Sequence, residues 1–280
     1  MFPKVLSRPL AASAGSGLTL DFRAGTPVRS SGRLPGIVRR RVKQWNPPTE
    51  TRHPRGGIVS GINLIELLIR VPVLLLALTL HEVCHGYFAY RMGDPTAYLQ
   101  GRLSLNPLKH LDPLGALCLL FAPIGWAKPV PINPLNFRDR RKGILVSTAA
   151  GPVSNLVQAI LFALVLRAVL AFTHGLPPAG HPQIVLFVGL LGELCYAAIW
   201  INVGLAVFNF LPLFPLDGFH ITLQLLPPAS QEWFAGMKLY GPFVILGLVL
   251  AENAFGVHIL SSLIMPPVRF LLYHVAGINE

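Results

Sequence analysis

Charged residues are scarce in this sequence. They make up 12% of its 280 residues, whereas hydrophobic residues make up 52% and the mean hydropathy is +0.56. Soluble domains usually carry about twice that share of charge, so the composition argues against a soluble protein. Acids are the scarcest, with 12 Asp and Glu against 23 Lys and Arg, which gives a net charge of +11.

Cysteine is also rare, and no internal repeat is visible. The three cysteines, Cys84, Cys118 and Cys195, are widely spaced and form no CxxC pair. This spacing excludes a disulfide framework and a thiolate metal site. No nucleic-acid-binding signature accompanies the basic residues, so we expect no nucleic acid among the partners.

Long apolar runs fill much of the remaining chain. A helix of roughly 20 apolar residues can cross the hydrocarbon core of a bilayer. We therefore expect an all-α polytopic protein embedded in a lipid bilayer. A soluble protein with buried helices is the alternative, but 280 residues offer little polar surface to cover them. The apolar runs lie near residues 61–80, 144–172, 184–211 and 241–264.

Residues 1–56 differ from the rest of the chain in composition. They are rich in Ser, Gly, Pro and Arg and hold much of the positive charge. We expect a disordered basic N-terminal tail, with a transit peptide or a non-native extension as alternatives. Residues 57–280 are then the membrane-embedded domain.

The segment between the first two apolar runs is polar and punctuated by proline and glycine. Its residues 91–142 carry eight Lys or Arg, whereas the opposite loop, 174–183, carries none. By the positive-inside rule, the 91–142 loop is cytoplasmic. Within it, 114–125 is apolar but too short to span, which predicts a short re-entrant or β-hairpin-like element between the first two core helices.

An HExxH motif ends the first apolar run, at His81-Glu82-Val83-Cys84-His85. Side chains four residues apart lie on one face of a helix, so His81 and His85 can bind one metal ion. Glu82 can then reach a water on that metal as a general base. The alternative is a pair of interfacial histidines with a snorkelling glutamate, but ionisable groups inside membranes are usually functional.

A catalytic zinc site usually has three protein ligands, and Asp217 is the candidate for the third. It follows an apolar run where prolines break the helix, although an Asp-Gly turn that caps a helix is the alternative. Asn209, eight residues earlier, could bind a substrate backbone or a developing oxyanion, or simply link two helices. For Asn155 we favour a structural link between helices.

Several other polar residues are not assigned to the site. We interpret His110, Asp112 and Lys128 as structural or solvated, and His220 as either close to the site or exposed.

Taken together, these motifs resemble the site-2 protease family of intramembrane zinc metalloproteases, in its compact bacterial-type branch without PDZ or CBS domains. The resemblance covers about residues 62–225 and rests on an ordered set: His81–Gly86, Gly93–Ala97, Gly101–Pro107, Trp126–Val130, Ala150–Pro152 and Asn209–Gly218. It implies a three-helix catalytic core plus one or two further membrane helices.

The resemblance also implies one Zn²⁺ per chain, held by His81, His85 and Asp217. Glu82 would be the general base and Asn209 the residue that positions substrate. The implied substrate is a transmembrane protein, cut in or near its membrane segment. We expect a multi-pass protein of the bacterial inner membrane, with an organelle membrane as the alternative, and the sequence leaves the oligomeric state open.

Other classes of protein could use the same residues. A membrane metal-ion transporter usually shows internal repeats, and none is visible. A membrane di-iron enzyme needs several histidine boxes, whereas this chain has one HxxxH pair. An inactive scaffold that binds helices would not need an intact set of ligands and general base.

Overall fold

The computed structural model describes residues 64–115, 127–173 and 182–278, all within one compact unit, Thr51–Glu280. The predicted tail, 1–56, lies outside the described residues. Among them the regular elements are helices, and the only strand-like pairing is one antiparallel bridge between Leu111 and Ala127. The predicted all-α class is confirmed.

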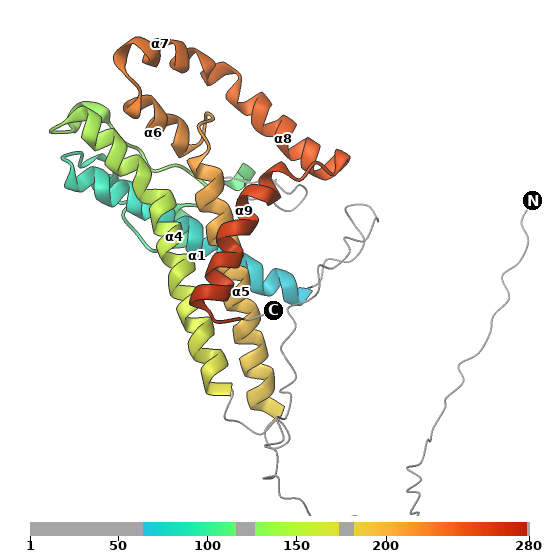
Figure 1. The fold of residues 1–280 in the computed structure, drawn as a ribbon. Helices are drawn as coiled ribbons and strands as arrows, with labels where there is room; N and C mark the ends of the chain where they lie inside the picture. Colours follow the sequence, from blue (N-terminus) through green and yellow to red (C-terminus); the bar gives the residue numbers. More distant parts are fainter. Residues whose placement is uncertain (1–63, 116–126, 174–181, 279–280) are drawn as a thin grey trace, which may run out of the picture. The chain divides into compact units, whose positions relative to one another are not determined.

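Three helices are long and apolar enough to cross a membrane: α1 (Leu64–Arg91), α4 (Arg140–Thr173) and α5 (Pro182–Phe210). Each packs against the other two (Figure 1). In each span, no more than 22% of the most apolar window is buried by the rest of the chain. Such outward-facing apolar surface suits lipid rather than water. The three-helix core of a multi-pass membrane protein is therefore confirmed.

Local chemistry fixes the ends of these helices. α1 ends at Arg91, two residues before Gly93, whose φ of +114° lies in the region that glycine tolerates best. α4 begins after Asp139, whose carboxylate accepts a hydrogen bond from the backbone N–H of Lys142 at 3.1 Å. This is the usual way in which an N-cap residue satisfies a free helical N–H group.

The chain beyond α5 is broken into short helices by proline and glycine. α6 (Asp217–Leu225) and α7 (Pro228–Gly236) precede α8 (Gly241–Phe255) and α9 (Ile259–Phe270). The single span predicted near 242–264 is wrong as a continuous helix, because α8 ends at Gly256 in the left-handed region, with φ +65°. The pair Pro228–Leu239 and Gly241–Glu252, bent by 59°, is the candidate for a fourth, broken span.

A cluster of buried apolar residues lies between α4, α5, α9 and the π-helical turn η4 (Leu271–Val275). α9 returns along α5 in Figure 1. By composition, residues 268–276 suit a helix at the membrane surface, but Val268, Leu271, Leu272 and Ala276 are buried in this core. The apolar stripe of the segment faces protein rather than the membrane surface.

The loop between α1 and α4 is organised around a buried aspartate. It contains α2 (Thr96–Leu99), η1 (Pro107–Lys109) and η2 (Pro134–Asn136). Asp94 is fully buried and accepts hydrogen bonds from the backbone N–H of Asn133 at 2.7 Å and the Asn136 amide at 2.8 Å, as well as from Thr96. Burial acts to raise the pKa of Asp94, but these hydrogen bonds outweigh it and hold the pKa below its usual value.

Most of the predicted re-entrant or hairpin-like element, 114–125, lies outside the described residues, because the structure describes it only as far as residue 115. Its two flanks are paired, through the bridge between Leu111 and Ala127 and a 2.8 Å hydrogen bond from Lys128 N–H to the His110 carbonyl. The predicted element itself stays a prediction.

Candidate metal centre

Two histidines and an aspartate from different parts of the chain meet between the helices. His81 and His85 lie one turn apart in the C-terminal half of α1, and both are buried. Asp217 is the first residue of α6. The His81 Nε2 and His85 Nε2 atoms are 2.9 Å apart, and Asp217 Oδ2 lies 3.2 Å from the first and 3.3 Å from the second. The structure thus brings together the three residues predicted as metal ligands.

Asn155, on the buried face of α4, fixes the orientation of His81. The Asn155 amide nitrogen donates to Asn202 Oδ1 at 2.9 Å and to the Ala77 carbonyl at 3.3 Å. Its Oδ1 atom is therefore the one that faces His81 Nδ1, at 2.6 Å. Because that oxygen can only accept, His81 Nδ1 carries the proton, and Nε2 of the neutral ring presents a lone pair.

A backbone carbonyl does the same for His85. The His85 Nδ1 atom lies 2.8 Å from the Ser147 carbonyl oxygen, which can only accept a hydrogen bond. When the ring is neutral, His85 therefore also presents an Nε2 lone pair. Asp217 Oδ2 is buried and has no hydrogen-bond partner among the described residues. With both rings neutral, three acceptor atoms would face one another at close range, an arrangement that a cation would stabilise.

Gly151 of α4 provides the space in front of these atoms. A Cβ atom at this position would lie 2.3 Å from His85 Nε2 and 2.7 Å from His81 Nε2. Only glycine lets the α4 backbone pass so close to both rings. Two imidazoles and one carboxylate are a ligand set typical of catalytic zinc, which keeps a further coordination position for water or substrate. The residues present therefore fit the metal that the sequence predicts.

Glu82 follows His81 and is half-buried. Its Oε2 atom accepts a hydrogen bond from the backbone N–H of Val130 at 2.9 Å. Val130 is itself buried and close to Gly86, where a Cβ would lie 3.0 Å from Val130 Cγ1. The loop after Ala127 thus holds the carboxylate predicted to be the general base.

The remaining predicted residues lie in varied settings. Asn209 is half-buried in the last turn of α5, and its amide donates to the Leu205 carbonyl at 3.0 Å. His110 is buried and bonded through Nε2 to the Ser104 carbonyl at 2.7 Å, which fits the predicted structural role. His220 is half-buried and its ring contacts Phe219.

Sequence reasoning did not single out Asn202, and it gave Asn155 only a structural role. A buried asparagine within an apolar span was the signal available for both, because an amide at membrane depth needs partners. Which partners it finds depends on the packing of α1, α4 and α5.

Comparison with known proteins supports this interpretation of the site. The model of the family described as "Peptidase family M50" matches residues 184–247. "Putative zinc metalloprotease YwhC" of Bacillus subtilis is 41% identical over 191 residues, which are 68% of this chain and 83% of that protein. The chain belongs to peptidase family M50. The predicted resemblance to site-2 proteases is thereby confirmed.

More distant relatives of this M50 chain carry a similar name. "Putative zinc metalloprotease Rip2" of Mycolicibacterium smegmatis is 30% identical over 181 residues, 63% of this chain and 64% of that protein. The Mycobacterium tuberculosis protein of that name is 29% identical over 188 residues, 65% of this chain and 66% of that protein. No solved structure matches the chain. Membership of M50 agrees with a zinc-dependent peptidase site in a multi-pass membrane protein.

Proposed function

We propose that this chain is an intramembrane zinc metalloprotease that hydrolyses peptide bonds in or beside transmembrane segments of other membrane proteins. The observation that carries the proposal is the convergence of His81 Nε2, His85 Nε2 and Asp217 Oδ2 within an apolar helical core. We assign residues 57–280 to the protease domain and 1–56 to a dispensable basic tail. One zinc ion per chain and a bacterial inner membrane are parts of the same proposal.

The position of the two histidines along α1 supports action within the bilayer. Arg91 ends the span Glu66–Arg91 and is exposed. His81 lies ten residues before it, which corresponds to about 15 Å along a helix axis. With Arg91 at the cytoplasmic surface, the site lies below that surface and within reach of a membrane-spanning substrate.

The geometry supports a role for each of these residues in the proposed reaction. Zinc held by the three ligands would supply Lewis acidity, which makes water a stronger nucleophile near neutral pH. Glu82, held by the Val130 N–H, takes the proton of the attacking water and delivers it to the nitrogen of the leaving amine. The bond that forms joins the water oxygen to the scissile carbonyl carbon, and the bond that breaks is the amide C–N bond.

The substrate must expose its backbone to this site. Backbone groups of an intact helix are already hydrogen-bonded, so a transmembrane substrate has to unwind locally. Helix-destabilising residues near the cleavage site should therefore increase the cleavage rate. We assign substrate positioning to Asn209, because its half-buried amide at the end of α5 lies where the chain turns towards Asp217.

The test compares cleavage of a single-pass membrane substrate by the purified full chain in detergent, wild type beside Glu82→Gln and Glu232→Gln. Glu232 is exposed on α7, which makes it a matched control for the loss of one carboxylate. Zinc content is measured on all three proteins. We expect equal zinc in all, with cleavage lowered roughly 100-fold or more in Glu82→Gln alone.

Two results would contradict the proposal. Full cleavage by Glu82→Gln would remove the general-base assignment. Wild-type protein that binds no zinc, and whose cleavage is unaffected by chelators, would remove the metal centre.

A further inference from the structure

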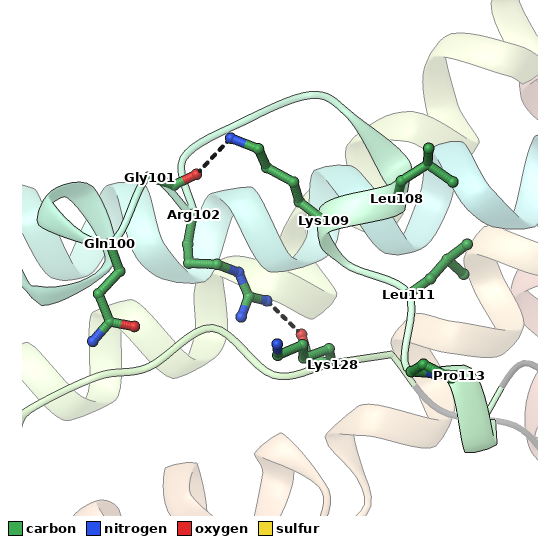
Figure 2. Close-up of a pocket in the computed structure, with 8 residues that line it drawn as sticks. All are labelled: Gln100, Gly101, Arg102, Leu108, Lys109, Leu111, Pro113 and Lys128. Carbon is green, nitrogen blue, oxygen red and sulfur yellow. Dashed lines mark hydrogen bonds between the residues drawn. The ribbon is translucent and has the colours of Figure 1, made fainter.

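A second site lies in the loop region, on residues that the metal centre does not use. It is an open pocket of about 400 Å³ between the turn at Gly101, the η1 segment and Lys128 (Figure 2). Three of its lining residues are cations, Arg102, Lys109 and Lys128, and none of the described residues that line it is acidic. The nearby Asp112 accepts a hydrogen bond from the Gly115 N–H at 2.8 Å, so its carboxylate caps a helical turn.

The cations of this pocket are held in place but not neutralised. Arg102 reaches across to the Lys128 carbonyl with an Nη2–O distance of 2.7 Å, and Lys109 Nζ lies 3.1 Å from the Gly101 carbonyl (Figure 2). None of the three forms an ion pair with another described residue. The Nε atom of Arg102 is buried and has no partner among the described residues. The pocket thus carries three positive charges with no carboxylate partner among the described residues, and an anion could supply one.

Apolar side chains in the same loop indicate how that anion is presented. Leu108 lines the pocket and is 73% exposed. Leu105 and Leu114, in the flanking sequence, are 69% and 59% exposed, and all three leucines lie outside the long spans. Exposed leucines in the loop that forms a cationic pocket suit an amphiphile, whose headgroup meets the cations and whose acyl chains cover the leucines. A soluble anion would gain nothing from these leucines.

We propose that this pocket binds a phosphate group, presented by an anionic phospholipid. Arg102 offers the planar fork that pairs with phosphate oxygens, and Lys109 and Lys128 add point charges. The site is independent of the protease chemistry, because none of the proposed metal ligands lines it. One of its lining residues, Lys128, is two positions before Val130, whose backbone N–H donates a hydrogen bond to Glu82.

Binding is measured by native mass spectrometry of the full chain in detergent, titrated with dioleoyl phosphatidylglycerol or dioleoyl phosphatidylcholine. The test variant is Lys109→Gln with Lys128→Gln, because both side chains are exposed. The matched control is Arg140→Gln with Lys142→Gln, which removes two exposed cations from the start of α4. We expect phosphatidylglycerol to bind more tightly, with affinity lowered roughly fivefold for each pocket cation removed.

A second variant and a soluble probe complete the test. Lys109→Arg with Lys128→Arg keeps both charges and should keep the affinity for phosphatidylglycerol, and unfolding temperatures check that every variant is folded. Inorganic phosphate that binds with the same dependence on the variants would support the site and assign it a soluble ligand. The proposal is overturned if the control pair loses as much affinity as the pocket pair, or if wild type shows no preference for phosphatidylglycerol.

Discussion

The side-chain oxygen of Asn155 lies 2.6 Å from Nδ1 of His81 and sets which nitrogen of that ring faces Asp217. The contact joins α4 to α1 across the middle of the core. Asn202 of α5 completes the link through its 2.9 Å hydrogen bond to Asn155. One polar chain thus connects all three spanning helices at the candidate metal centre.

Replacing Asn155 should weaken zinc binding. In Asn155→Leu the His81 ring loses the acceptor that fixes it, and loss of such a supporting hydrogen bond typically lowers metal affinity about 10- to 100-fold. Competition with a chelator of known affinity measures the change. Asn155→Asp keeps an acceptor and should lose less, and Ser154→Ala is the neighbouring control on α4. Unchanged zinc affinity in Asn155→Leu would show that the contact does not orient the ligand.

Gly151→Ala should abolish zinc binding without unfolding the helices. The added methyl group would lie 2.3 Å from His85 Nε2, in the space that a bound ion needs. Gly204→Ala is the matched control, because a Cβ on that α5 glycine meets nothing within 4 Å. Zinc content and helical circular dichroism are measured on both variants. A Gly151→Ala protein with full zinc would mean that the ion lies elsewhere.

Val130→Pro removes the N–H group that holds Glu82 while keeping the metal ligands. Pro129 and Pro131 already flank this residue, so another proline suits the local backbone. A hydrogen bond to a charged group contributes about 1.5–3 kcal/mol, so kcat should fall roughly 10- to 100-fold with zinc content unchanged. Val130→Ile keeps the N–H group and should stay active. Equal activity in the two variants would contradict the role assigned to this contact.

Asp94→Asn should destabilise the loop between α1 and α4. The buried carboxylate accepts several hydrogen bonds, and their loss costs about 1–3 kcal/mol of unfolding free energy at pH 7. Because the pKa of Asp94 is lower in the folded protein than its unfolded value of about 3.9, its contribution is present above that pH. The contribution is lost as pH falls through the folded pKa.

Thermal unfolding of wild type and Asp94→Asn in detergent, at neutral pH and then at decreasing pH below 4, measures that contribution. The gap between the two midpoints should be widest at neutral pH and should narrow in acid. Glu232→Gln, on the exposed face of α7, should show no such dependence. A gap that stays constant with pH would show that the Asp94 charge is not what stabilises the loop.

The sequence predicted the three side chains that converge at the candidate metal centre better than it predicted the helices of the C-terminal third. His81 and His85 share a helix face by spacing alone, and Asp217 follows an apolar span at a proline break. Local patterns of this kind allow a site to be predicted, because ionisable residues are rare at membrane depth and few residue types bind metals.

Features that depend on packing between helices could not be predicted from the sequence. The apolar run near 242–264 predicts one span, because a single glycine at 256 does little to lower the hydropathy of the run. At Gly256, however, the backbone enters the left-handed region and α8 has ended. The apolar residues of 268–276 would suit either a membrane surface or a protein core. Their contact with α4 and α5 shows that they belong to the core. The Asn155–Asn202 contact has the same origin.

The hydrogen bond from Val130 to Glu82 places the two halves of the proposed chemistry under separate control. The proposed metal ligands lie on α1 and α6 and are supported by α4, whereas the proposed base is held by a loop outside the spanning helices. A shift of that loop could turn the carboxylate away while the metal stays bound. Such a protein would bind its full complement of zinc and yet be catalytically inactive. Its zinc content would therefore not predict its turnover rate.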